Sequence, residues 1–426
     1  MSTLRVQLEG DRIDLSNIPI SVEIIDHEFK TRKMTMRGVE TVNIEPGSYL
    51  VQAHLPSGET AVAMTSVMEK TEAQVTLTSS KSPHEWLAWL HFLGETAERT
   101  EETPPSDFPE IWVRLWVDER ELLPQLPIGQ QPASRRWTIA PPAFWLGAQM
   151  YDAGVASCWL YSANQPFYPV SQPLYLRMLQ VGGPRVPSRL VSLPPAFGQI
   201  QVLIRPSRIP TTLNGGLTVK AVSQDLKAET LLHYLASGSL EAAQMVSHEV
   251  VVDAEQFEGF PADIAEQMLR DKRINPTGAA IGGYYLLRTG ALLRLHDWPN
   301  NLANWVAWLP DGAVIHAWQL LRQSVETEQT RARERLLQAC ERGIPVYTEG
   351  VRLLIDGLEL FADNARAQNR PDEEVEQALQ KIRQYATAMD WNQRLTTFYG
   401  TDPETPSLRA GPFTSIDPFE PHFPPI

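Results

Sequence analysis

The chain has 426 residues, of which 43% are hydrophobic, 21% charged and 8% aromatic, a balance that indicates globular domains and excludes a wholly disordered chain. Its formal net charge is -14, because 51 acidic residues outnumber 37 basic ones. An acidic chain gains little from replacing the counterions of phosphates, so the composition argues against nucleic acid and against anionic membranes as partners.

The two cysteines, Cys158 and Cys340, are too few for a disulfide framework or a structural zinc site. Their use indicates a reducing compartment. The first residues alternate like a strand and show no basic segment followed by an apolar one, and no stretch of about 18 residues stays apolar. We therefore predict a cytoplasmic protein with no membrane partner.

Residues 1–79 alternate apolar and polar side chains in short segments separated by Gly and Pro turns. This pattern predicts a small antiparallel β-sandwich. Residues 45–53, Glu-Pro-Gly-Ser-Tyr-Leu-Val-Gln-Ala, resemble the hairpin of PEGA-type and transthyretin-like modules. That resemblance implies a module that presents or spaces other domains and has no chemistry of its own.

Residues 80–108 predict a short helix followed by an acidic, proline-containing linker. Residues 109–224 are predicted to form a second β-rich domain, whose strongest strand covers residues 111–117. Prolines interrupt this region repeatedly, which favours short strands and many loops. The other predicted strands are residues 157–161, 174–181, 189–193, 199–205 and 217–222.

From about residue 225 the apolar period becomes helical, and residues 225–398 are predicted to form an α-helical repeat domain. Residues 276–288 align without gaps to residues 310–322, an offset of 34 positions (310 minus 276). Each copy begins with a proline, which a helix tolerates in its first turn because the missing N–H is not needed there. Pro345 follows at an offset of 35 (345 minus 310) and predicts the start of a third helix of this kind.

A period near 34 residues with two helices per unit is typical of tetratricopeptide-like (TPR-like) solenoids. The consensus Trp-Leu-Gly-Tyr spacing of that family is absent, so the period predicts the geometry and not membership. Such units stack and leave a concave surface that binds a peptide or a protein. Tyr284 and Trp318, which occupy the same position in the two copies, are candidate partner-binding residues. The alternative is a set of helix pairs whose similarity is accidental.

Residues 295–310 are unusually aromatic, with three tryptophans between positions 298 and 308. Tryptophan contributes much of the binding energy at protein interfaces. Trp305, Trp308 and Leu309 have helical spacing, which favours packing between repeats. Trp298 precedes the predicted helix in a loop and is the stronger candidate for binding a partner.

Residues 399–426 form a proline-rich, extended tail. Residues 416–423, Ile-Asp-Pro-Phe-Glu-Pro-His-Phe, resemble a linear docking segment, because proline holds a peptide extended and lowers the entropy lost on binding. The alternative, which we favour, is a tail that is disordered or packs on the chain itself. The candidate partner-binding residues of the tail are Phe413, Phe419 and Phe423.

Cys340 lies in a sequence, Gln-Ala-Cys-Glu-Arg-Gly, that is one insertion away from the Gln-Ala-Cys-Arg-Gly pentapeptide around the caspase nucleophile. His296 lies 44 positions upstream (340 minus 296), near the spacing of that family. A caspase cysteine, however, follows a buried apolar strand, whereas the residues before Cys340 are charged and predict a helix that Gly343 caps. We therefore expect no catalytic role for Cys340.

No other motif predicts a catalytic, metal or cofactor site. No two histidines are spaced four apart for zinc, and neither a Gly-x-Ser-x-Gly elbow nor a phosphate-binding loop occurs. His316 falls within an apolar helix and is expected to be a core histidine. A Ser, His and Asp triad assembled from distant positions stays open.

The helical half resembles uncharacterised bacterial proteins associated with caspase-fold or trypsin-like peptidases in conflict (defence) loci. The resemblance covers residues 225–400, and residues 295–305, Leu-His-Asp-Trp-Pro-Asn-Asn-Leu-Ala-Asn-Trp, carry most of it. It implies a partner, regulator or substrate of such a peptidase, and it implies no catalytic residue.

We therefore predict a multidomain protein with an N-terminal β-sandwich, a second β-rich domain and a C-terminal TPR-like helical repeat. Its predicted function is that of a non-enzymatic, protein-binding adaptor or regulator. Two alternatives stay open: a hydrolase or peptidase with a dispersed site, and a structural subunit of a larger assembly.

Overall fold

The computed structural model describes residues 2–9, 20–36, 38–55, 60–78, 111–122, 136–140, 149–152, 157–162, 176–194, 199–206, 217–223, 231–232, 235, 264–323, 326–408 and 422–423. By their internal contacts the chain divides into two compact units. The first comprises Met1–Thr96 with Leu226–Gln267, and the second comprises Ala97–Asp225 with Met268–Ile426. The five-part division predicted from the sequence stays a prediction.

The N-terminal strands form two small sheets. One has the order β4-β1-β7 and the other β3-β2-β5-β6. Along β1 every second residue, Leu4, Val6 and Leu8, is buried, as expected of a strand with one face in a core. β1 pairs in parallel with β7, so the predicted sandwich is not wholly antiparallel. The strands are β1 (Ser2–Glu9), β2 (Ile20–Asp26), β3 (Thr31–Met36), β4 (Val39–Ile44), β5 (Gly47–His54), β6 (Thr60–Val67) and β7 (Glu72–Thr78).

A larger sheet in the second unit has the order β17-β16-β13-β12-β8-β18, and β9 also pairs with β8. β13 is buried along its whole length, and β12 is buried at every position except Arg177, so these two strands lie in the interior of this unit. The elements are β8 (Ile111–Asp118), α2 (Glu119–Leu122), β9 (Trp137–Ile139), β12 (Arg177–Gly183), β13 (Val186–Leu193), β16 (Thr397–Asp402), β17 (Thr405–Pro406) and β18 (His422–Phe423).

Strands from distant parts of the sequence meet in this sheet. β16, which follows the helices, pairs with β13, so that Phe398 lies opposite Leu190. β18 from the tail pairs with β8, and Phe423 lies opposite Ile111. A further antiparallel sheet has the order β10 (Gln149–Asp152), β11 (Ser157–Ser162), β14 (Gln199–Pro206), β15 (Leu217–Ser223).

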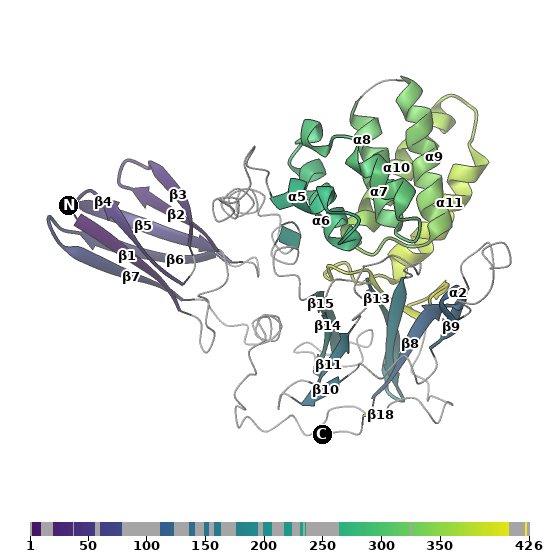
Figure 1. Ribbon diagram of the computed structural model, residues 1–426, viewed down its shortest axis with the longest axis horizontal. Coiled ribbons are helices and arrows are strands. Elements are labelled where there is room, and N and C mark those ends of the chain that lie inside the picture. Colours follow the sequence, from purple (N-terminus) through teal and green to yellow (C-terminus); the bar gives the residue numbers. More distant parts are fainter. Residues whose placement is uncertain are drawn as a thin grey trace. The chain divides into compact units, whose positions relative to one another are not determined.

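The C-terminal region is helical, as predicted (Figure 1). α6 and α8 begin at the two prolines that the 34-residue offset identified. α8 contacts α6, α7, α9 and α10, and α9 contacts α11, which is the neighbour pattern expected of stacked helix pairs. The seven α-helices described in this C-terminal region are α5 (Ile264–Arg270), α6 (Pro276–Arg288), α7 (Trp298–Trp305), α8 (Pro310–Arg322), α9 (Glu326–Arg342), α10 (Thr348–Ala367) and α11 (Glu373–Ala388).

The β-rich first half and the helical second half confirm the predicted multidomain class. α6 and α8 approach closely at Gly283, where an added Cβ would lie 2.9 Å from Ile315 Cδ1. A glycine inside a helix usually destabilises it, and here the missing side chain permits the helices to pack. No helix in the described ranges is both long and apolar enough to cross a bilayer.

The third proline does not begin a helix. α10 begins at Thr348, three residues after Pro345. The intervening residues are extended because they pair with the segment before β16: Thr396 N–H donates to the Val346 carbonyl at 2.8 Å, and Tyr347 forms a β-bridge with Leu395. Tertiary pairing therefore overrides the local signal of the proline.

A buried carboxylate at the start of α8 connects this helix to the middle of α6 and to the residues just before α10. Asp311, in the first turn of α8, is fully buried and accepts hydrogen bonds from the Tyr284 hydroxyl of α6 at 2.7 Å and from the backbone N–H of Val346 at 2.8 Å. The Tyr347 N–H, just before α10, donates to it at 3.3 Å. Burial raises the pKa of Asp311 to about 6, while the hydrogen bonds oppose that rise.

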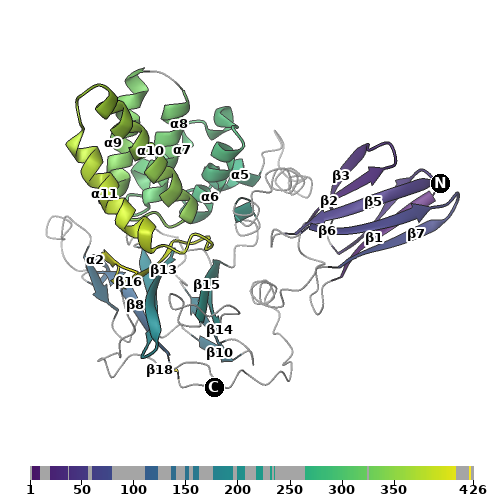
Figure 2. The same ribbon diagram turned by 180° about the vertical axis from the view of Figure 1, so that it is seen from behind.

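The last helix joins the helical layer to the large sheet. The Tyr385 ring of α11 packs edge-on against Phe398 of β16, with ring centroids 5.2 Å apart. The Tyr385 hydroxyl donates to the Pro403 carbonyl at 2.9 Å. In the reverse view a loop leads from the end of α11 into β16 of this sheet (Figure 2). The helices and the large sheet therefore form one packed unit.

Candidate functional site

Trp298 is the first residue of α7 and is held in place by the turn before it. His296 adopts a positive φ of 47°, and its ring centroid lies 4.5 Å from that of Trp298. The His296 carbonyl accepts a hydrogen bond from Gln319 Nε2 of α8 at 2.6 Å. A positive φ is unfavourable for a residue other than glycine, so this turn is fixed by its contacts. Trp298 is half-buried and helical, where sequence analysis expected a loop.

Trp305, at the other end of α7, is 59% exposed. The expectation that it packs between repeats is therefore wrong, whereas Leu309 is fully buried as predicted. The helix turns Leu302 and Ala303 toward the core, and Trp305 stands beside that face. Large aromatic side chains that remain in solvent are a recurring feature of binding surfaces.

Lys272 lies against both tryptophans. Its Nζ is 5.6 Å from the ring centroid of Trp298 and 5.4 Å from that of Trp305, which is cation–π geometry. The residue is only 5% exposed, and burial lowers the pKa of Lys272, although Asp271 and Asp297 oppose the shift. The lysine thus fixes the spacing of the two indole rings and places a positive charge beneath them.

Arg335 of α9 borders the opposite side of α7. Its guanidinium donates to Asn300 Oδ1 at 3.0 Å, to Asn304 Oδ1 at 2.8 Å and, within α9, to Gln338 Oε1 at 2.6 Å. All three acceptors are neutral amides. Burial lowers the pKa of Arg335, and the charge of Arg331 lowers it further. We call this surface the α7 face; its residues are Lys272, Trp298, Asn300, Asn304, Trp305 and Arg335.

The other predicted partner-binding residues lie elsewhere. Tyr284 is fully buried and bonded to Asp311, so it presents no surface. Trp318 is half-buried, and its Nε1 donates to the Leu353 carbonyl of α10 at 2.8 Å, which makes it a contact between helices. Phe423 lies in β18 within the large sheet. Phe413 and Phe419 fall outside the described residues. Among those candidates that the structure describes, Trp298 alone belongs to the α7 face.

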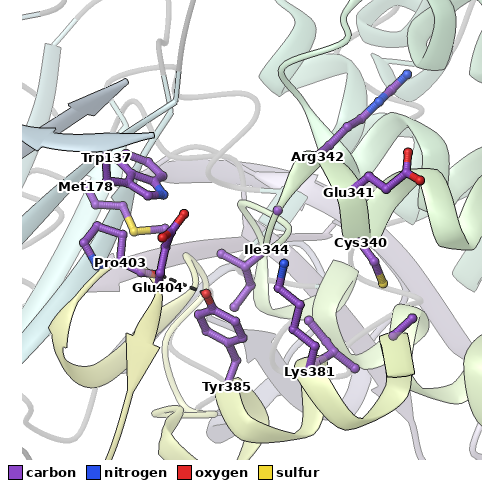
Figure 3. Close-up of a pocket in the computed structure, with 13 residues that line it drawn as sticks. Trp137, Met178, Cys340, Glu341, Arg342, Ile344, Lys381, Tyr385, Pro403 and Glu404 are labelled. Carbon is purple, nitrogen blue, oxygen red and sulfur yellow. Dashed lines mark hydrogen bonds between the residues drawn. The ribbon is translucent and has the colours of Figure 1, made fainter. Parts of the chain in front are cut away.

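Cys340 borders a cavity of about 480 Å³ between the helices and the large sheet (Figure 3). Lys381 extends toward Ile344 at its edge, whereas Glu341 and Arg342 extend away from Trp137. The cavity has space for an apolar side chain or a small molecule of that size. Its apolar lining includes Trp137, Met178, Ile344, Ile382 and Tyr385.

The Cys340 thiol in this cavity is not set up as a nucleophile. Burial raises the pKa of Cys340 to about 12, and the nearby Lys381 opposes this only in part. Nucleophilic cysteines are thiolates, stabilised by positive charge or by a helix N-terminus. Cys340 instead lies near the C-terminal end of α9, where the helix dipole disfavours a negative charge.

We expect Cys340 to be unreactive. In a Cys158→Ser variant, which leaves Cys340 as the single thiol, alkylation by iodoacetamide at neutral pH should be at least about 100-fold slower than for free cysteine, because so little thiolate is present. Denaturant should restore the ordinary rate. Alkylation of the folded variant at a rate close to that of free cysteine would reopen the catalytic interpretation.

The two cations of the α7 face, Lys272 and Arg335, were not among the residues predicted from the sequence to bind a partner. Lys272 is 26 positions before Trp298 (298 minus 272) and carries no local signal. A signal for Arg335 did exist: Arg331, Arg335 and Arg342 recur at helical spacing on one side of α9. For metal binding, the residues that the structure describes include no group of three or more His, Cys, Asp or Glu side chains placed to share an ion.

Residues 230–418 match the model of a family described as the Y4kD C-terminal domain. This range contains α5 to α11 and strands β16 and β17, and hence the whole α7 face. No curated protein and no solved structure matches the chain. The helical region is therefore similar to an uncharacterised family of domains.

Proposed function

We propose that the chain is a non-enzymatic protein-binding adaptor or regulator and that it holds its partner on the α7 face. The observation that supports this most directly is Trp305, a tryptophan that is 59% exposed on a helix that buries Pro299, Leu302 and Ala303. Trp298 lies near Trp305, because the Lys272 ammonium group contacts the rings of both tryptophans. Paired aromatic anchors with fixed spacing lose little conformational entropy on binding, which favours a specific interface.

A peptidase is the partner that we predict from the resemblance of residues 225–400 to bacterial proteins of defence loci. In this proposal the chain is the regulator, adaptor or substrate of that enzyme. The β-sheets would space or dock the helical region, as modules of this kind do. The Cys340 thiol, with its raised pKa, gives no support to a catalytic function of this chain itself.

Site-specific crosslinking of the full chain tests the proposal. Trp305 is replaced by the photoreactive p-benzoylphenylalanine, and the protein is irradiated in extracts of its native host. Trp391 is the matched control, because it is also partly exposed (38%) but lies after α11, away from the α7 face. We expect a peptidase or another discrete protein to crosslink at position 305 and not at position 391.

The partner is then purified and its affinity measured. Trp298→Ala and Trp305→Ala should each weaken binding by about tenfold or more, as expected for anchor residues, while Trp391→Ala should leave it unchanged. If positions 305 and 391 crosslink the same proteins, or if neither tryptophan variant weakens binding, the α7 face is not the partner site and the proposal fails.

A further inference from the structure

The α7 face is unusual for its charge. Lys272 and Arg335 are partly or fully buried cations, and Arg342 is a third on the same helix as Arg335. Within the residues that the structure describes, none of the three forms an ion pair, whereas the neighbouring Arg333 pairs with Asp372 at 2.6 Å and with Glu374 at 2.7 Å. A shielded cation without a counter-charge is unfavourable, and an arriving anion would relieve it.

Burial has a measurable consequence for these cations. It lowers the pKa of Arg342 to about 10 and lowers the pKa of Lys272 and of Arg335 as well. Arg342 Nη1 is buried and has no hydrogen-bond partner. Arg335 and Arg342 are seven positions apart, so both lie on the same side of α9. The two arginines therefore extend one positive strip along this helix.

The carboxylates near this strip do not cancel it. Glu334 and Glu341 each precede an arginine by one residue, which turns them about 100° around α9, and both are exposed to solvent. Glu328 pairs with Arg331 at 2.8 Å in an exposed i,i+3 pair, the kind that contributes little and exchanges readily. The Asp297 carboxylate accepts a hydrogen bond from Asn300 Nδ2 at 3.3 Å. The surface between α7 and α9 thus presents mainly cations and amides, with the exposed Asp297 carboxylate at the start of α7.

Cations border α7 on both sides, although the chain as a whole carries a charge of -14. Lys272 lies on the side of Trp298 and Trp305, and Arg335 lies on the side of Asn304. Cations that form no ion pair among the described residues thus lie beside the exposed Trp305 and the half-buried Trp298, and they offer a local charge complement to negative groups. A purely ionic ligand would leave the indole rings of Trp298 and Trp305 in contact with solvent. A ligand that also has an apolar group therefore fits this surface better.

We propose that the partner segment held on the α7 face is an acidic peptide, rich in Asp or Glu, with at least one aromatic or aliphatic residue that covers Trp305. This inference rests on the proposed function and specifies the chemistry of its partner. Carboxylates of the segment contact Arg331 and Arg335, and its apolar residue packs on the indole rings. Lys272 and Arg342 contribute through their field from below the surface.

Labelled peptides and the full-length protein test this directly. The probe is a peptide of about 12 residues with Glu and Asp around a central Leu-Phe pair, and its control carries Lys at every acidic position. Fluorescence anisotropy should show that the acidic peptide binds at least about tenfold more tightly than the basic one, and that rising ionic strength weakens it. Equal binding of the two peptides, or binding of neither, would overturn the inference.

The affinities of point variants show where on the protein the acidic peptide binds. Arg331→Gln, which alters an exposed side chain, and Arg335→Gln should each lower the affinity for the acidic peptide by about fivefold or more. Trp305→Ala should lower it by a similar factor. Arg383→Gln is the matched control, since Arg383 is an exposed arginine of α11 that pairs with Glu359 at 2.7 Å. An effect of Arg383→Gln as large as that of Arg331→Gln would show general charge attraction and overturn the inference.

The crosslinking and peptide-binding experiments together distinguish a failure of this inference from a failure of the proposed function. A partner that crosslinks at position 305 but is not displaced by the acidic peptide leaves the proposed function standing and overturns the inference. Acidic-peptide binding with the expected variant pattern, but without any crosslinked protein, supports the inference and contradicts the proposed function. A short oligonucleotide that binds more tightly than the acidic peptide would identify a nucleic acid as ligand and overturn the inference.

Discussion

Replacing Asp311 with alanine is expected to lower the free energy of unfolding of the helical region by about 3 to 4 kcal/mol at neutral pH. The Asp311 carboxylate accepts from the Tyr284 hydroxyl and from the N–H groups of Val346 and Tyr347. Alanine leaves these three donors without an acceptor at a position that is fully buried. Urea unfolding of the full chain, followed by far-ultraviolet circular dichroism, measures the loss, because that signal reports mainly on the helices.

Two variants show whether the loss comes from the unpaired donors. Tyr284→Phe removes one donor and keeps the ring, so it should lower the free energy of unfolding by about 1 kcal/mol. Asp363→Ala removes an exposed carboxylate that forms an exposed ion pair with Arg366, and it should have an effect below about 0.5 kcal/mol. A loss for Asp311→Ala as small as that for Asp363→Ala would contradict the role of Asp311.

The helices that could be predicted are those with strong local signals. The first two prolines of the 34-residue offset begin α6 and α8, because a proline in the first turn fits a helix and little else competes there. Pro345 failed as a signal because its carbonyl accepts from the Thr396 hydroxyl at 2.7 Å, in a pairing across about 50 residues. A better signal was glycine at the third helical position, which Gly278, Gly312 and Gly350 share.

Gly350 also shows why the third helix begins where it does. A Cβ at this position would lie 2.2 Å from the Tyr284 hydroxyl and 2.8 Å from Asp311 Oδ1. The start of α10 therefore packs directly on the buried carboxylate. Sequence periodicity cannot reveal such a contact, because it reports which face of a helix is apolar and not which helix meets it.

Long-range pairing set the other limit of prediction. The position between residues 398 and 399, where the sequence predicted the helical region to end and the tail to begin, falls inside β16 (Thr397–Asp402). β16 pairs with β13 across the entire helical region, so no window of sequence contains both partners. The α7 face has the same origin, since Lys272 and Arg335 reach α7 from segments on either side of it in the chain.

His316 is the source of the second large effect, a change in how stability depends on pH. It is 3% exposed, and its Nδ1 has no hydrogen-bond partner. Burial, together with the positive charges of Arg335 and Arg331, lowers the pKa of His316 to about 4, and the charge of Asp297 opposes this shift only in part. Between pH 6.5 and about 4 the unfolded chain therefore binds more protons at this residue than the folded one. His316 thus lowers stability as the pH falls through this window.

Asp311 has the opposite sign over nearly the same window. Its folded pKa of about 6 lies above the value of 3.8 for a free carboxyl group, so the folded state binds the proton first as the pH falls. Asp311 therefore raises stability as the pH falls from about 6 toward 3.8. Each residue contributes a change of about 3 kcal/mol across its window, and in the wild-type protein the two changes largely cancel.

Single substitutions should remove this cancellation. Relative to the wild type, His316→Gln should gain about 3 kcal/mol of stability as the pH falls from 6.5 to about 4. The reason is that glutamine takes up no proton, so the unfolded state of the variant no longer gains stability by protonation at this position. Asp311→Asn should lose a similar amount relative to the wild type over the same interval, because it cannot take up the stabilising proton. Urea unfolding at several pH values in this range measures both slopes. Curves for the two variants that run parallel to that of the wild type would show that neither group titrates as its burial requires.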